Sequence, residues 1–536
     1  MKPKRIENLS RKVTSDFVSR LEEIVGKENV NTDEMDRMLY SHDLAPLPKE
    51  AGLAFKNIPD VVVRPSTVEE ISEIVKLAYR NGVAITPRGA STWGLGGSMP
   101  TEAGMLIDMS AKMNQIYEVD TVNMSMKVGA GCTWKAAMEA AEKEGYMVGS
   151  YPSSFPSATV GGWVSTSGIG PGGYKFGGAA ENILNLEVVL PDGTVVVTGF
   201  DKLSNNMSGY NLNKMFSGAE GTLGVIATVT LRIHPKGEIR PLAYSFENLR
   251  DIGAPINELV HHPSVKPIHI AWSDYLHFEN QRKAGIDVPA EIKNLWLVTL
   301  QGDKEFVDLE EKYLDGLAAK YGGVKMSADI AAHEWSERCY EFRARKVGVG
   351  SIPAEVVVPV VSWSDFVDEC YKGFEVMKME AGGIIGMIAD RSTAMFMPYY
   401  FKDDETLLGM AAFSFNFYLG ERAAEYGGRN LGFGVFFAYN LELVRDKGSL
   451  ELMRDLKTFM DPVDVMNPGH LVTGKTRFGI SMNKKLMSLG SVMMQGAKKL
   501  LPQDANFAKN AERFKYSDMD VEMEESRVVT YGDGTQ

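Results

Sequence analysis

The alternation of apolar and polar residues is clearest between residues 61 and 87. Two short apolar runs, residues 61–63 and 83–86, flank a stretch in which apolar residues recur at helical spacing: Val68, Ile71, Val75 and Ala78. Thr67 begins this stretch and Glu70 follows three residues later, which is the arrangement of a capping box at a helix N-terminus. The pattern therefore predicts a strand–helix–strand unit.

Regular patterns continue as far as residue 235. They predict strands at residues 104–108, twice within 116–130, and at 225–233, a helix at 133–144, and a β-hairpin across 183–199 around Pro191-Asp192-Gly193. Residues 152–178 are instead dense in Gly, Ser and Pro, which predicts irregular chain.

The composition changes after Pro235. From about residue 240 to 430, alternating helical and strand patterns predict a second α/β domain, and residues 455–469 predict a helix that ends in a proline-bounded turn. Residues 481–501 form a Met- and Lys-rich amphipathic stretch, and the residues after it are polar and acidic. We therefore divide the chain into residues 1–238, 239–445, 446–480 and 481–536.

The bulk composition is that of an ordinary globular protein. Of 536 residues, 44% are apolar and 24% are charged, and the formal net charge of −13 gives no overall attraction for nucleic acid or an anionic membrane. The three cysteines form no CxxC pair, so neither a disulfide framework nor a cysteine-ligated iron–sulfur cluster is expected. The sequence shows no signal-peptide core and no apolar run of the roughly 20 residues that span a membrane. We therefore expect a cytoplasmic protein without a transmembrane segment.

Residues 87–100 (PRGASTWGLGGSMP) form a glycine-rich loop directly after a predicted strand. The small residues let the backbone approach a ligand closely, and Arg88, Ser91 and Thr92 add hydrogen-bond donors, a combination that suits a pyrophosphate. Considered alone, the loop is explained equally well as a solvent-exposed turn. It is not a Rossmann fingerprint, because the glycines of residues 94–97 have the wrong spacing.

A second Gly- and Ser-rich stretch, residues 152–177, is longer than most loops of a compact domain. It is either a long surface loop or a segment that wraps a large polar cofactor. In the second case, backbone and hydroxyl contacts would come from Pro152, Ser153, Ser154, Thr159, Val160, Gly161 and Gly162. Glycines also punctuate residues 209–235, and Asn467-Pro468-Gly469 follows a predicted helix.

In this order and spacing, the four segments resemble a known family. PRGASTWGLGGSMP resembles its pyrophosphate loop, YPSSFPSATVGGWVSTSGIGPGGYKFG its second flavin-binding stretch, GYNLNKMFSGAEGTLGVIATVTLRIHP the end of its FAD domain, and MDPVDVMNPGHL the C-terminal segment that returns to the flavin. The family is that of the FAD-binding PCMH-type flavoproteins (vanillyl-alcohol oxidase/p-cresol methylhydroxylase). Within it, the FAD domain of this chain resembles most the branch of the D-lactate dehydrogenases and glycolate oxidase subunits. The resemblance implies an α+β fold, with a two-lobed PCMH-type FAD-binding domain and an α/β cap (substrate) domain.

The resemblance also implies which residues hold FAD. It assigns the pyrophosphate to Arg88, Gly89, Ala90, Ser91 and Thr92, and the flavin to Thr159, Gly161, Gly162, Ser165 and Gly168. It places Glu220, Gly221, Val225 and Ile226 on the adenine or ribose side, and Asn467 near the isoalloxazine. Residues 90–92 contain no histidine of the kind that carries a covalent flavin in such proteins, so the implied FAD is non-covalent. A covalent link to a His or Tyr of the cap stays open.

The resemblance is weak in the middle of the chain, the region that determines substrate specificity in this family. The hydroxy-acid branch binds a divalent metal through HxGDGNxH and SGEHG, but residues 386–401 and 427–440, which stand in these places, contain no histidine. We therefore expect no metal site. Phe436-Phe437 likewise replace the Tyr–Arg pair with which the phenol-oxidising branch holds a phenolate, so we expect an apolar or unusual substrate wall.

Candidate catalytic residues come from the same region. Arg343 and Arg345 stand where an arginine holds the substrate carboxylate in the hydroxy-acid branch, although solvated helix charges explain them equally well. Asp390 and Arg391 are either a buried pair near the flavin or a simple surface pair. Tyr399 can exchange a proton with a substrate only if it faces the flavin ring.

These observations favour an FAD-dependent oxidoreductase that passes a hydride from a small organic substrate, a hydroxy acid or an alcohol, to flavin N5. Two alternatives stay open: a flavin-carrying electron-transfer or structural subunit of a multi-subunit redox complex, and a non-redox flavin enzyme of the ether-lipid synthase type. The expected partners are a small-molecule substrate and either a second copy of the chain or an electron-accepting subunit, but no nucleic acid. Residues 481–501 could contact such a partner, a membrane surface or the protein's own core.

Overall fold

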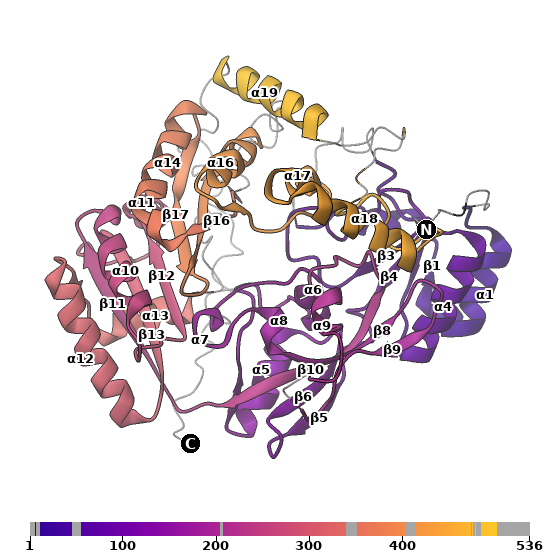
Figure 1. The fold of residues 1–536 in the computed structure, drawn as a ribbon, viewed down its shortest axis with the longest axis horizontal. Helices are drawn as coiled ribbons and strands as arrows, with labels where there is room; N and C mark the ends of the chain where they lie inside the picture. The colour runs from indigo at the N-terminus through magenta and orange to yellow at the C-terminus, as the bar shows by residue number, and fades with distance from the viewer. Residues whose placement is uncertain are drawn as a thin grey trace.

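Three β-sheets organise the part of the chain that the structure describes (Figure 1). Two smaller sheets form the N-terminal half, and a larger sheet forms the cap. This computed structural model describes residues 6, 11–44, 55–203, 207–338, 351–401, 413–472, 474, 478 and 484–500.

The first sheet has the strand order β1 (Val30–Asn31), β2 (Val61–Val63), β4 (Met105–Asp108), β3 (Ile85–Arg88), and β2, β4 and β3 are parallel. The apolar faces of α1 (Ser15–Val25) and α4 (Val68–Asn81) share one buried core with this sheet. Thr67 Oγ1 accepts the N–H of Glu70 at 3.1 Å, as the sequence predicts for the start of α4. The strand–helix–strand unit is thus confirmed, although its second strand begins two residues later than the apolar run.

The second sheet is antiparallel, with the order β5 (Ile116–Asp120), β6 (Ser125–Gly129), β10 (Val225–Pro235), β8 (Ile183–Val189), β9 (Val195–Val197), and β7 (Tyr146–Val148) pairs with β10. These strands, the β8–β9 hairpin and α5 (Trp134–Lys143) confirm the predictions for this region. Residues 152–178 are not wholly irregular, because they contain the short helices α6 (Val160–Ser165) and α7 (Gly173–Phe176). The glycines of α6 reflect close packing, since a Cβ on Gly161 would lie 2.5 Å from Cβ of Ala130.

The cap begins directly after β10. Its sheet is built from antiparallel pairs in the order β14 (Val324–Lys325), β11 (Glu238–Phe246), β13 (Asn294–Gly302), β12 (His269–Ser273), β17 (Glu380–Ile388), β18 (Thr393–Phe401), β16 (Val356–Pro359), β19 (Arg429–Asn430), and β15 (Ser351–Pro353) pairs with β18. The arrangement of helices and an antiparallel sheet gives the cap an α+β character.

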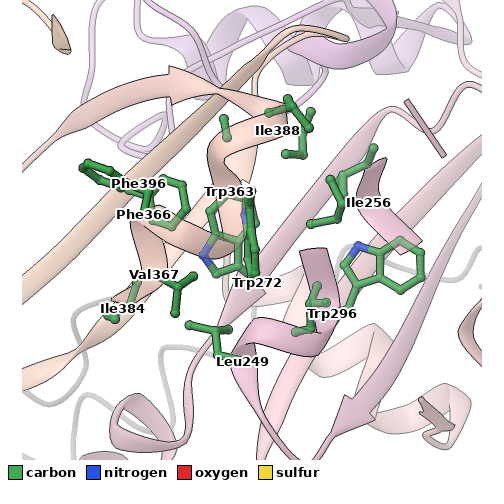
Figure 2. Close-up of a cluster of buried hydrophobic side chains, with 14 of the residues drawn as sticks. Leu249, Ile256, Trp272, Trp296, Trp363, Phe366, Val367, Ile384, Ile388 and Phe396 are labelled. Atoms are coloured by element: carbon green, nitrogen blue, oxygen red, sulfur yellow. The ribbon is translucent and has the colours of Figure 1, made fainter. Parts of the chain in front are cut away.

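Helices cover the cap sheet unequally. One face packs against α10 (Gly253–His261), α12 (Lys304–Lys320), α14 (Trp363–Val376) and α16 (Ser414–Glu425) around the largest buried core. Figure 2 shows part of this core, where Trp272 contacts the rings of Trp363 and Phe396 at centroid distances of 5.1 and 5.0 Å. On the other face, α13 (Ala328–Ser336) covers β11 and β13, and α11 (Tyr275–Lys283) packs mainly on β17. The part of that face on β16 and β18 turns toward the N-terminal lobes instead.

The chain returns to the first lobe after the cap. α17 (Leu441–Val444) and α18 (Lys447–Met460) lead to a segment that lies beside β3, where Ile85 donates its N–H to the Val465 carbonyl and Asn467 donates to the Ile85 carbonyl, each at 2.7 Å. The predicted helix therefore begins earlier than residue 455 and ends at Met460, just before Asp461-Pro462.

The amphipathic stretch forms α19 (Lys484–Leu500), which lies on α16 at the outer edge of the molecule (Figure 1). The face toward the cap is mostly polar: Ser491 is buried, and Lys498 Nζ donates to the Lys378 carbonyl at 3.2 Å. The outward face carries the apolar residues, with exposed fractions between 60% and 87% for Leu489, Val492, Met493 and Leu500. Met494, by contrast, packs against the cluster around Phe417 and Phe437, so the apolar residues that point away from the core are Leu489, Val492, Met493 and Leu500.

None of the helices in the described ranges is both long enough and apolar enough to cross a membrane.

Candidate cofactor and substrate site

A cavity of about 1330 Å³ lies where the two N-terminal lobes meet the cap sheet. Its wall is formed by segments far apart in the sequence, around residues 87–98, 152–169, 214–226, 351–359 and 427–437. The cavity is therefore bounded by the glycine-rich loops on one side and by cap strands on the other.

The first loop follows β3, and residues 88–92 all line the cavity. Ser91 adopts a left-handed conformation with φ of +56°, which is costly for a residue with a side chain and persists only where the surroundings hold it. The hydroxyls of Thr92 and Ser154 lie 3.2 Å apart and join this loop to the second one. Several hydroxyl groups thus converge where the two loops meet.

The second loop lies directly beside the first. The cavity wall includes Pro152, Ser153, Thr159, Gly161, Gly162, Ser165 and Gly168. Val160 does not belong to the described lining; it is fully buried behind it and donates its N–H to the Cys132 carbonyl. Its side chain therefore supports the loop from the core.

The two loops contact each other at Gly89 and Thr159, where the absence of a side chain on Gly89 leaves the backbone accessible to a cofactor. A Cβ on Gly89 would lie 2.1 Å from Thr159 Oγ1, so only glycine allows this approach. Thr159 Oγ1 is itself buried and has no hydrogen-bond partner in the described part of the chain. Buried hydroxyls without partners are rare, so this one is available to a bound polar group. The two loops together fit a pyrophosphate-bearing cofactor such as FAD.

The third segment contributes Glu220, Gly221, Val225 and Ile226 to the same wall. Glu220 is buried and has a φ of +50°, and its Oε2 has no partner among the described residues. Burial raises the pKa of its carboxyl to about 7, although N–H groups of Phe433 and Gly434 lower it in part. Glu220 therefore lies at the junction between the third segment and the cap.

Asn467 forms hydrogen bonds with the first loop, with the third segment and with strand β3. Its Nδ2 donates to the carbonyls of Gly97 at 3.1 Å and Glu220 at 2.7 Å, and its own N–H donates to Ile85. Asn467 does not line the cavity within the described residues, but its buried Oδ1 has no partner there. The residue thus positions the loops from behind.

The cap side of the cavity is largely apolar. Val357, Met395, Met397 and Phe437 form much of it, and three ionisable side chains, Glu355, Arg429 and Arg445, interrupt it. Glu355 accepts a hydrogen bond from Trp93 Nε1 at 2.7 Å, and Arg429 lies on the neighbouring strand β19. This wall can therefore hold both an apolar and a charged part of a small molecule.

Comparison with protein families decides the class of this site. Residues 59–199 match the FAD binding domain family, and residues 238–471 match the family of FAD linked oxidases, C-terminal domain. The chain belongs to the FAD-linked oxidoreductases. FAD is accordingly the cofactor of this flavoprotein, as the sequence predicts.

Curated relatives of the flavoprotein are similar over most of their length. It is 27% identical over 480 residues to the glycolate oxidase subunit GlcD of Bacillus subtilis, which covers 87% of this chain and 98% of the relative. It is 27% identical over 435 residues to the mitochondrial D-lactate dehydrogenase [cytochrome] 1 of Saccharomyces cerevisiae, which covers 76% of this chain and 72% of the relative.

Solved structures share the fold at lower identity. A p-cresol methylhydroxylase with substrate bound has a TM-score of 0.74 at 17% identity, over 87% of this chain and 98% of the other. An alkyldihydroxyacetonephosphate synthase has a TM-score of 0.68 at 18% identity, over 87% of this chain and 88% of the other. These likenesses confirm the expected two-domain α+β PCMH-type fold of the flavoprotein.

The candidate catalytic residues lie apart from the cavity wall or outside the described ranges. Asp390 is exposed and accepts hydrogen bonds from Ser392 and Thr393, while Arg391 donates to the carbonyls of Val260 and His262. Tyr399 is fully buried, with its hydroxyl 2.9 Å from Nδ1 of His277. These three do not line the cavity among the described residues, whereas Arg343 and Arg345 lie outside those residues.

Sequence reasoning missed Trp93, Glu355 and Arg429. Glu355 stands alone before the apolar run of β16, and Arg429 lies between two glycines and Asn430, where no local pattern marks it as a ligand. An isolated charge at the edge of a buried strand was the available signal. In the described ranges, no group of three or more His, Cys, Asp or Glu side chains is placed to hold a metal ion.

Proposed function

We propose that this flavoprotein is a dehydrogenase that takes a hydride from a small hydroxy compound, a hydroxy acid or an alcohol, held between the glycine-rich loops and the cap sheet. One observation carries the proposal: the cofactor loops and a wall with both apolar and ionisable side chains line the same cavity. The relatives named glycolate oxidase subunit and D-lactate dehydrogenase support a hydroxy compound as the substrate.

The residues of the loops would act by binding and orienting. Arg88, Ser91, Thr92 and Thr159 would hold the pyrophosphate and ribityl side of FAD, and Glu220 and Asn467 would fix the loops around it. When bound, FAD supplies the acceptor for the hydride. On the opposite side, Met395 and Met397 line the cavity and would exclude water from the reacting carbon, which would strengthen polar contacts within the site.

We propose further that the flavoprotein works with a second copy of itself or with an electron-accepting subunit. The apolar outward face of α19 supports this, since an exposed apolar stripe of this kind is commonly an interaction surface. The Bacillus subtilis relative is itself named a subunit. Removal of residues 476–536, followed by measurement of the assembly mass in solution, tests this part of the proposal.

Anaerobic mixing tests the dehydrogenase directly. The purified holoprotein is mixed with hydroxy acids, alcohols and matched compounds that lack the hydroxyl, such as lactate against propionate, while the absorbance of the oxidised flavin is followed. We expect bleaching by at least one hydroxy compound and not by its matched partner. A flavin that dithionite reduces but no hydroxy compound does would contradict the proposal and favour an electron-transfer subunit.

A further inference from the structure

Two of the three ionisable side chains of the cap wall, Glu355 and Arg429, are placed to act on one molecule. We propose that Glu355, positioned by Trp93, accepts the hydroxyl proton of the substrate, and that Arg429 on the neighbouring strand binds a carboxylate of the same substrate. This inference rests on the proposed function and assigns its substrate side to two residues of the cap.

The Glu355 carboxylate is positioned by a hydrogen bond, but no cation among the described residues neutralises its charge. Trp93 Nε1 donates to Glu355 Oε2 at 2.7 Å. Trp93 is itself fixed, because its ring packs on Gly432 so closely that a Cβ there would lie 1.8 Å from the ring. Burial raises the pKa of the Glu355 carboxyl to about 6, and the Trp93 hydrogen bond opposes this in part. Such a carboxylate is charged at neutral pH yet is basic enough to take a proton.

Arg429 is a half-buried cation that pairs with no carboxylate in the part of the chain that the structure describes. Its Nη1 donates to the Asn430 carbonyl at 3.0 Å. Burial lowers the pKa of its guanidinium, and the positive charge of Arg445 lowers it further. A buried charge is costly unless it is paired, and a carboxylate is the planar partner that a guanidinium holds best. The side chain therefore favours an anionic ligand in the cavity.

Strand register sets the two groups a useful distance apart. β16 pairs with β19 so that Val357 lies opposite Arg429, which makes Glu355 and Arg429 diagonal neighbours on the cavity-lining face. Diagonal neighbours in an antiparallel pair have Cα atoms roughly 7–8 Å apart. This spacing leaves room for a small hydroxy acid with its hydroxyl toward Glu355 and its carboxylate toward Arg429.

The step balances with FAD as the oxidant. The substrate O–H bond would break and its proton would pass to the Glu355 carboxylate, while FAD, when bound, would supply the acceptor for the hydride from the C–H bond. The C–O single bond becomes a carbonyl. The products are an oxo acid, reduced FAD and protonated Glu355.

Binding of oxalate, which resembles the substrate but carries no oxidisable C–H bond, tests Arg429 without turnover. Calorimetric titration of the oxidised holoprotein should show saturable binding that weakens about ten-fold or more in Arg429→Met, because a charge-assisted hydrogen-bonding pair is lost. Arg429→Lys should restore part of the affinity, and Arg20→Met, which changes an exposed arginine of α1, should change nothing. Equal oxalate binding by wild type and Arg429→Met, absence of binding to the wild type, or preference for inorganic phosphate would overturn the carboxylate assignment.

Rapid reduction of the flavin by a hydroxy acid tests Glu355. Glu355→Gln should slow the reduction about 100-fold or more, as expected for loss of a proton acceptor, while oxalate binding should not weaken, because the substitution removes a negative charge beside the anion. The wild-type rate should fall as the pH drops through about 6, and Trp93→Phe should move this fall to higher pH, since a hydrogen bond to the charged form is removed. An unchanged rate in Glu355→Gln, or a pH profile that Trp93→Phe does not move, would overturn the role of this pair.

The two levels of the proposal fail in different ways. If neutral alcohols reduce the flavin and hydroxy acids do not, the dehydrogenase stands and the Arg429 subsite is wrong. If no compound reduces the flavin but oxalate still binds through Arg429, the anion subsite stands, whereas the dehydrogenase and the role of Glu355 fall.

Discussion

Residues 90–92, at the edge of the cavity, include no side chain that could carry a covalent flavin through histidine. We therefore predict that FAD is released when the holoprotein is denatured with acid or heat. The measurement is flavin fluorescence in the supernatant after the polypeptide is precipitated. Flavin that stays with the precipitated chain would instead point to a covalent link in the cap.

The buried carboxyl of Glu220 predicts a pH dependence of stability in the apoprotein. Because its folded pKa is raised to about 7, its contribution to stability is full below its unfolded pKa and is lost as the pH rises through 7. Between the unfolded pKa of a glutamate, about 4.3, and the folded pKa of about 7, the free energy of unfolding should fall by an amount on the order of 3 kcal/mol. Thermal unfolding of the apoprotein between pH 5 and 8 should show it, and Glu220→Gln should remove most of the slope. An identical slope in both proteins would argue against a buried, ionising Glu220.

At the scale of elements, α18 is anchored by a buried ion pair. Lys457 Nζ lies 2.5 Å from Asp461 Oδ2, donates to the carbonyls of Thr222 and Met466, and is only 2% exposed. Lys457→Met should destabilise the protein by about 3–5 kcal/mol, because the Asp461 charge is left buried without its partner. Denaturant unfolding measures this, with Lys447→Met as the control, since Lys447 is 91% exposed at the start of the same helix.

Most of the helices and strands could be predicted from the sequence. Local rules were sufficient for α4, whose cap at Thr67 and end at Gly82 stand in the sequence, and for the β8–β9 hairpin at Pro191-Asp192-Gly193. They were insufficient for α6, where glycine density reflects the close approach to Ala130.

Residues of the candidate site could be predicted from the sequence only where they lie within one continuous segment. The hydroxyls of Ser91 and Thr92 could be inferred from their own loop, but Trp93 and Glu355 are 262 residues apart and meet through tertiary packing alone. Periodicity likewise identified the stripe on α19 but not its direction, because the polar face of that helix is the one that docks on the cap.

At the scale of the whole molecule, the outward stripe of α19 predicts an assembly. Removal of residues 476–536 should leave the FAD content unchanged, since the segment beside β3 ends before them, and should reduce the mass of the assembly in solution. Light scattering measures the mass. Met493→Glu, which leaves the docked face intact, should have the same effect. Loss of FAD or of folding on truncation would show that α19 belongs to the core of the flavoprotein.

The pairing of residues 465–467 with Ile85 has a consequence for biosynthesis. The ribosome releases the glycine-rich loops hundreds of residues before the segment that closes them, so the nascent N-terminal lobes remain without Asn467 and its two hydrogen bonds for most of translation. We therefore expect stable flavin loading only after the C-terminal segment has been released from the ribosome, so a chain that ends inside the cap should lack the yellow colour of the finished one.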